Sequence, residues 1–84
     1  MNEIQTLVVE EIRSVAKGLD ASQQLTPTTK LLRKGFLSSL ELLQLVLALE
    51  TALSISIPLE ELTSENFETV EDIAALVKRA SDAG

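Results

Sequence analysis

Residues 35–53 read GFLSSLELLQLVLALETAL, a loop with two serines that leads into a long leucine-rich segment. Ser38 followed three residues later by Glu41 fits a capping box. In that motif the serine hydroxyl accepts from the third helical amide, and the glutamate reaches back to the amide of the cap. Taking Ser39 as the cap instead would put a leucine at the partner position. The pattern therefore predicts that Ser38 is the N-cap of a helix over 39–53.

Ser39 then lies on the first helical turn, where it has no capping role and its hydroxyl can face solvent. The first turn of a helix has unpaired amide donors and a partial positive charge, and both favour an attached phosphate. Ser39 is therefore a candidate attachment point for a phosphate ester. The alternative is that both serines only begin a helix, because serine is among the preferred N-cap residues.

The apolar residues of the predicted helix fall at spacings of three and four, which indicates one face turned to the core. The predicted core stripe, with two flanking leucines named last, is Leu43, Val46, Leu49, Leu53, Leu42 and Leu45. The residues predicted to be more exposed are Leu40, Glu41, Gln44, Leu47 and Thr51. Exposed leucines beside Ser39 would form an apolar contact surface. Burial of those leucines in a crowded small core is equally compatible with the pattern.

The chain on either side predicts two more long helices and a short one. Helical spacing over 2–17, followed by Gly18, predicts a first helix that ends at this glycine. A last helix starts at Thr69 with Asp72 as capping partner, and residues 64–67 fit one short helical turn. The expected core face of that last helix consists of Val70, Ile73, Ala74, Val77 and Ala80.

Two segments lack a helical period. Residues 18–38 are rich in turn-forming types and predict a long loop, in which two adjacent leucines take a helical turn. Residues 54–58 predict an extended connection that buries its two isoleucines. We therefore expect an all-α fold in one domain over 1–84. It is a small four-helix bundle of three main helices and one short helix, with a long loop between helices one and two.

The composition argues against several classes of function. The net charge of −6 opposes binding to nucleic acid or to an anionic membrane and suits basic protein partners. There is no cysteine and no histidine, so thiolate metal sites and the usual Ser-His or Cys-His catalytic pairs cannot form. We expect no enzyme activity, no catalytic residue and no metal site. The N-terminus lacks the features of a signal peptide, and no apolar run approaches the roughly 20 residues of a membrane span. These features predict a soluble, cytoplasmic protein.

The run from Gly35 to Glu41 resembles the modification motif of acyl carrier proteins, in which a glycine precedes Asp-Ser-Leu. Ser39 matches the serine of that motif and Leu40 its leucine. The likeness continues through 48–50, Ile57-Pro58 and 67–70, and it covers about 31–77. It implies a four-helix bundle whose Ser39 is converted by a phosphopantetheinyl transferase, using coenzyme A and magnesium, into a 4'-phosphopantetheine ester.

The resemblance also implies what the attached arm does. Its thiol would hold acyl or aminoacyl intermediates as thioesters for acyl-loading and acyl-processing enzymes of fatty-acid, polyketide or related biosynthesis. We expect a monomer that docks through residues surrounding Ser39, namely Leu40, Glu41, Gln44, Leu47 and Glu50. The alternative function is an unmodified helical domain for protein–protein interaction, with the exposed leucines binding a partner helix.

The sequence departs from the family pattern in two respects. Ser38 replaces the aspartate of the motif, which keeps a cap but removes a charge that modifying enzymes can read. The helix over 39–53 has only Glu41 and Glu50 as acidic residues, whereas the loop before it carries a basic cluster of Lys30, Arg33 and Lys34. These differences favour a dedicated set of partners, in secondary metabolism or aminoacyl transfer.

Overall fold

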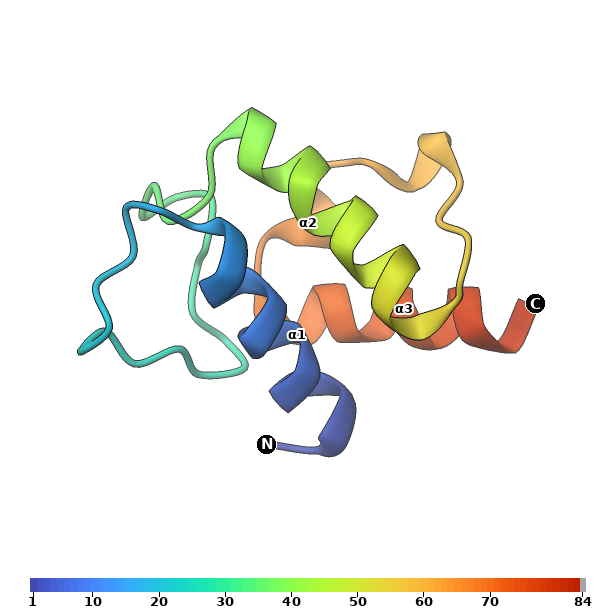
Figure 1. The fold of residues 1–84 in the computed structure, drawn as a ribbon, viewed down its shortest axis with the longest axis horizontal. Helices are drawn as coiled ribbons and strands as arrows, with labels where there is room; N and C mark the ends of the chain where they lie inside the picture. Colours follow the sequence, from blue (N-terminus) through green and yellow to red (C-terminus); the bar gives the residue numbers. More distant parts are fainter. Residues whose placement is uncertain (84) are drawn as a thin grey trace.

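The computed structural model describes residues 1–83 and is helical (Figure 1). The α-helices are α1 (Glu3–Val15), α2 (Ser39–Leu53) and α3 (Val70–Ala83), and the 3-10 turns are η1 (Leu59–Glu61) and η2 (Glu65–Phe67). Over the described residues there is no strand, which confirms the all-α prediction. The short helix predicted over 64–67 is the 3-10 turn η2, whereas η1 was not predicted.

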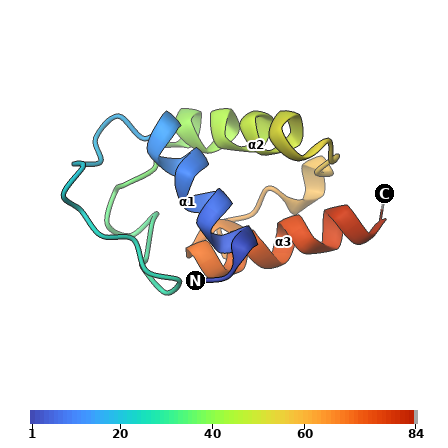
Figure 2. The same ribbon diagram turned by 60° about the horizontal axis from the view of Figure 1, so that its bottom comes forward.

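Helix α1 holds the other two long helices together. Figure 2 shows α2 along one edge of the molecule and α3 along the opposite edge, with α1 running between them. Helix α1 contacts both partners. It starts with a capping box in which Gln5 N donates to Asn2 Oδ1 at 2.8 Å and Asn2 N donates to Gln5 Oε1 at 3.2 Å.

The predicted end of the first helix is wrong by two residues. Helix α1 ends at Val15, and Ala16 takes an extended conformation with φ −83° and ψ 94°. The amide of Lys17 donates to the Glu41 carboxylate at 3.0 Å instead of continuing the helix. A contact with a residue so distant in sequence therefore ends α1 before its glycine.

The core is aliphatic around a single buried ring, Phe67, which is fully buried. Among the described residues Thr69 is the one buried polar residue. Its hydroxyl donates to Asp72 Oδ2 at 2.8 Å and accepts from Asp72 N at 3.0 Å, so the predicted capping partner is confirmed. Helix α3 buries four of the five residues of the predicted face, and the fifth, Ala80, is half-buried. It also buries Leu76, which was not predicted.

The predicted core stripe of the second helix needs correction. Leu45, placed at the flank, is fully buried, whereas Leu43, placed in the core, is 48% exposed. The buried residues of α2 are Leu45, Val46 and Leu49, with Leu42 and Leu53 half-buried beside them. Apolar residues surround most of this helix, so its hydropathy pattern does not define which face meets α1.

The long loop is confirmed and is fastened to the start of α3. Leu31 N donates to Glu68 O at 2.7 Å, and Glu71 N donates to Pro27 O at 2.9 Å. The expected helical turn is present, with Lys34 N donating to Lys30 O at 3.0 Å. These bonds position the segment that leads into α2.

The connection after α2 is extended, as predicted. Ser54 takes the left-handed conformation at φ 53°, and the chain then runs into η1. Ile57 is buried and Ile55 half-buried. The amide of Ile57 donates to Glu50 Oε2 at 2.8 Å, which joins the connection to the last turn of α2.

Candidate functional site

The start of α2 has the predicted capping geometry. Ser38 is extended at φ −81° and ψ 170°, and its hydroxyl accepts from Glu41 N at 3.2 Å. Glu41 Oε1 accepts from Ser38 N at 3.0 Å, which completes the capping box. The prediction of Ser38 as N-cap is therefore confirmed, and it leaves Ser39 as the first residue of the helix.

Ser39 is exposed, and within residues 1–83 its hydroxyl forms no hydrogen bond. The first amides of α2 and the positive end of its dipole lie at the same position. An exposed hydroxyl at such a helix start fits a phosphate ester, because the negative charge is favoured there and the hydroxyl has no structural duty to lose.

Gly35 shapes the approach to this helix. Its φ of +72° lies in the left-handed region of backbone conformation, which residues other than glycine adopt only at a cost in free energy. Its amide donates to Leu32 O at 3.1 Å, so the chain turns sharply just before the serines. The buried Leu37 then anchors the end of the loop in the core.

Glu41 has a second partner that the sequence did not reveal. Its Oε2 accepts from the amide of Lys17 at 3.0 Å, while its other oxygen accepts from Ser38. The amides of Ser38 and Lys17 lower the pKa of the Glu41 carboxyl below its usual value. The carboxylate thus joins the end of α1 to the start of α2 and fixes the turn that carries Ser39.

The exposed side of α2 is an apolar surface. Leu40 is 65% exposed and Leu47 is 56% exposed, as predicted, and Gln44 between them is also exposed. Leu43, at 48%, joins them on the same side. We refer to Leu40, Leu43 and Leu47 as the leucine stripe; its spacing of three and four places the side chains on one face of the helix.

The expected docking residues thus differ in how they are held. Leu40, Gln44 and Leu47 are free on the surface, but the two acidic members are half-buried. Glu41 bonds to two amides, and Glu50 bonds to the amide of Ile57. Both carboxylates of α2 therefore accept hydrogen bonds from backbone amides.

The basic cluster lies on the turn that precedes Gly35, and we refer to residues 30–34 as the basic turn. Arg33 Nε lies 3.0 Å from Glu68 Oε1, and Lys30 Nζ lies 3.8 Å from the same oxygen. Lys34 is exposed and forms no ion pair within residues 1–83. Glu68 thus pairs with two of the three cations of the basic turn.

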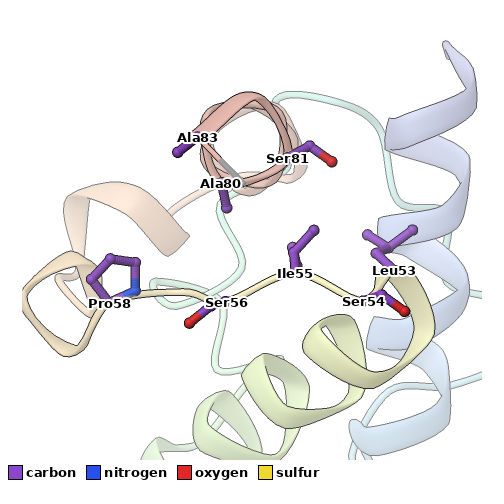
Figure 3. A pocket seen from close by; sticks show the side chains of 8 residues that line it. All are labelled: Leu53, Ser54, Ile55, Ser56, Pro58, Ala80, Ser81 and Ala83. Atoms are coloured by element: carbon purple, nitrogen blue, oxygen red, sulfur yellow. The ribbon is translucent and has the colours of Figure 1, made fainter.

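A groove of about 740 Å³ lies at the opposite end of α2 (Figure 3). Figure 3 shows Ile55 and Ala80 pointing toward each other across it. A helix of this length spans roughly 22 Å, so the groove lies far from Ser39. The lining residues carry no ionisable side chain; they are Leu53, Ser54, Ile55, Ser56, Pro58, Ala80, Ser81 and Ala83.

Two further features are settled over residues 1–83. None of the helices there is long and apolar enough to cross a membrane. In the same part of the chain, no three side chains of the types that bind metal ions lie close enough together to hold one.

Residues 6–77 match the protein family described as phosphopantetheine attachment site. The chain belongs to this family. It is also similar to aminoacyl carrier protein 1 of Bradyrhizobium diazoefficiens, with 27% identity over 75 residues that cover 89% of this chain and 82% of the relative. The resemblance to acyl carrier proteins found in the sequence is therefore confirmed.

Membership in the phosphopantetheine attachment family defines the general role. The family consists of carriers that hold 4'-phosphopantetheine covalently, and they are not enzymes. Carriers of this kind interact with partner enzymes that act on the cargo. The exposed hydroxyl at the start of α2 suits the phosphate of this group, since it offers an attachment atom beside amide donors.

Proposed function

We propose that Ser39 carries the 4'-phosphopantetheine arm and that the arm's thiol holds acyl or aminoacyl groups as thioesters. The observation that carries this proposal is the division of roles between the two serines. Ser38 and Glu41 complete the cap of α2, which leaves the Ser39 hydroxyl exposed on the first turn. The arm supplies the sulfur that this cysteine-free chain lacks.

A phosphopantetheinyl transferase would attach the arm. The Ser39 oxygen forms a bond to the β-phosphorus of coenzyme A, the pyrophosphate bond breaks, and adenosine 3',5'-bisphosphate leaves. The serine proton passes to a base of the transferase, because both oxygens of the Glu41 carboxylate at this turn accept from backbone amides. The amides at the start of α2 favour the phosphodiester that results.

We propose that partner enzymes dock on the exposed side of α2 around Ser39. The docking residues are Leu40, Glu41, Gln44, Leu47 and Glu50. A mobile arm on a small carrier raises the local concentration of its cargo at whichever active site the carrier contacts. Exchange among several enzymes favours a modest apolar contact over a large permanent interface, so we expect a monomer. We also propose that the protein is located in the cytoplasm.

The similarity to an aminoacyl carrier protein supports an aminoacyl cargo. That protein is an aminoacyl carrier, and it matches most of this chain. We therefore propose an aminoacyl group as the first cargo to test, ahead of the fatty-acyl and polyketide intermediates. Loading of the modified protein by amino-acid-activating enzymes, followed by mass spectrometry of the thioester, compares these classes directly.

Intact mass spectrometry after incubation with coenzyme A and a broad-specificity transferase tests the attachment site. We expect the mass of one phosphopantetheine on the wild type and on Ser38→Ala, and no addition to Ser39→Ala. If Ser39→Ala still gained the mass of phosphopantetheine and Ser38→Ala did not, Ser38 would be the attachment residue.

The exposed leucine stripe also supports a second candidate function. An unmodified interaction domain could use the same leucines to bind a partner helix, with Ser39 only beginning α2. A wild-type protein that keeps its bare polypeptide mass with every competent transferase would favour this function over the carrier role.

A further inference from the structure

The charge beside Ser39 is opposite in sign to that of the whole chain. The protein carries a net charge of −6, but the turn leading to α2 is basic and the acidic residues of α2 are bonded to amides. We infer that the partners that dock over Ser39 present an apolar patch with an acidic rim toward the basic turn. This inference rests on the proposed carrier function and specifies the chemistry of its partners.

The apolar part of the contact is the leucine stripe. Its three leucines are each about half exposed or more, on the face of α2 that turns away from α1 and the core. Gln44 lies among them and carries no charge. This face offers a partner apolar contact but no ionic one, so any charge selection arises at its edges.

The acidic residues of α2 contribute little to that selection. Glu41 accepts from the amides of Ser38 and Lys17, and Glu50 accepts from the amide of Ile57. Both oxygens of Glu41 already accept from amides, so a partner cation that recruited this carboxylate would compete with the cap of α2. Glu50 has one oxygen bonded to an amide, and it lies in the last turn of α2, about three helical turns from Ser39. A basic partner rim therefore gains less here than at a helix whose carboxylates are free.

The basic turn supplies the charge that is free. Glu68 is shared between Arg33 and Lys30, while Lys34 forms no ion pair over residues 1–83. Lys34 precedes Ser39 by five residues, so even a fully extended chain would place them within roughly 18 Å. A standard interface buries about 800 Å² on each partner, a disc about 32 Å across. That disc extends about 16 Å from its centre. The chain turns at Gly35 and is therefore not fully extended, so Lys34 lies near the rim of a partner centred on Ser39.

Charge at the edge of an interface acts mainly on the rate of association and on its salt dependence. An acidic rim should speed encounter with the basic turn at low salt, and a basic rim should slow it. A single exposed charge pair should change the rate of association about two- to fivefold, and this change should become smaller as the salt concentration is raised.

The test uses one phosphopantetheinyl transferase as the probe partner, in two forms. The first form has basic residues at the rim of its docking surface, and the second has those residues replaced by glutamate. The specificity constant kcat/KM for the carrier is measured at saturating coenzyme A for the wild type and for Lys34→Glu. The readout is the wild-type to Lys34→Glu ratio with each form, and then the quotient of the two ratios. A general loss of transferase activity cancels in this quotient.

We expect the acidic-rim form to prefer the wild type and the basic-rim form to prefer Lys34→Glu. The quotient should be about four or more at low salt and should fall toward one at high salt. Lys78→Glu on α3 is the matched control, because it changes the net charge equally on an exposed residue of another helix. Its quotient should stay near one.

A quotient near one for Lys34→Glu, with Ser39 modified normally, would overturn the acidic-rim inference and leave the carrier function intact. An equal quotient for Lys78→Glu would also overturn it, because net charge alone would then explain the preference. Failure of both transferase forms to modify Ser39, under conditions in which they modify another carrier, would refute the carrier function and this inference with it.

Discussion

The corrected orientation of α2 can be tested with two neighbouring leucines. Leu45 is fully buried and Leu43 is 48% exposed, although both lie in the middle of the same helix. Leu→Ala at either position changes helix propensity by the same small amount, so that contribution cancels in the comparison. The difference between the two variants then reports on burial alone.

The expected magnitudes follow from the burial of each side chain. Leu45→Ala removes three carbons from a closed core and leaves a cavity, which costs about 3 kcal/mol. Leu43→Ala removes the same carbons from a side chain that is half in water. At roughly 0.8 kcal/mol per buried carbon this costs about 1 kcal/mol, without a cavity. For a domain of this size the melting temperature falls by roughly 4–8 °C per kcal/mol.

Thermal unfolding followed by circular dichroism at 222 nm measures the difference. We expect Leu43→Ala to lower the melting temperature by about 4–8 °C and Leu45→Ala by roughly 12–24 °C. The modification rate should respond in the opposite order. At a temperature where both variants are folded, Leu43→Ala should lower kcat/KM for the transferase more than Leu45→Ala. Equal losses of stability, or a larger loss at Leu43, would show that our assignment of the core face is wrong.

Three other changes test the framework around Ser39. Ser38→Ala should cost about 1 kcal/mol through loss of the cap, and unchanged stability on urea unfolding would contradict the capping box. Gly35→Ala should cost roughly 1–2 kcal/mol, because alanine is strained at φ +72°; a neutral result would mean that the turn rearranges without penalty. The pKa of Glu41 is lowered in the folded state, so its contribution to stability is present above its ordinary pKa of 4.5 and is lost as the pH falls through the folded value. The difference in melting temperature between wild type and Glu41→Gln should therefore be largest at pH 7 and should shrink as the pH falls below 4.5, and a difference that does not change with pH would refute this linkage.

Local patterns predicted the start of α2 well. The capping box needs only a serine and a glutamate three residues apart, so both of its hydrogen bonds could be inferred from adjacent sequence. The exposure of Leu40 and Leu47 followed from the same helical register. These features depend on a few consecutive residues and little on tertiary structure.

Contacts between distant segments could not be predicted in this way. The bond from the Lys17 amide to Glu41 spans 24 residues, and it ends α1 two residues before the expected stop. The assignment of Leu43 and Leu45 failed because leucine occupies most faces of α2, so only the packing of α1 decides which of them is buried. No periodicity in the sequence contains that information.

The missed contact of Glu41 bears on how the carrier works. A carboxylate that bonds to the ends of two helices holds the turn with Ser39 in place, and it does so without covering the leucine stripe. Ser39, the proposed attachment residue, is thus fixed relative to the core, while the leucine stripe beside it stays exposed. A transferase that meets this surface pays little to order it, because the start of α2 is already formed. Glu41 therefore acts by holding this turn in position, and under the proposed carrier function we expect the choice among partners to depend on the leucine stripe and the basic turn.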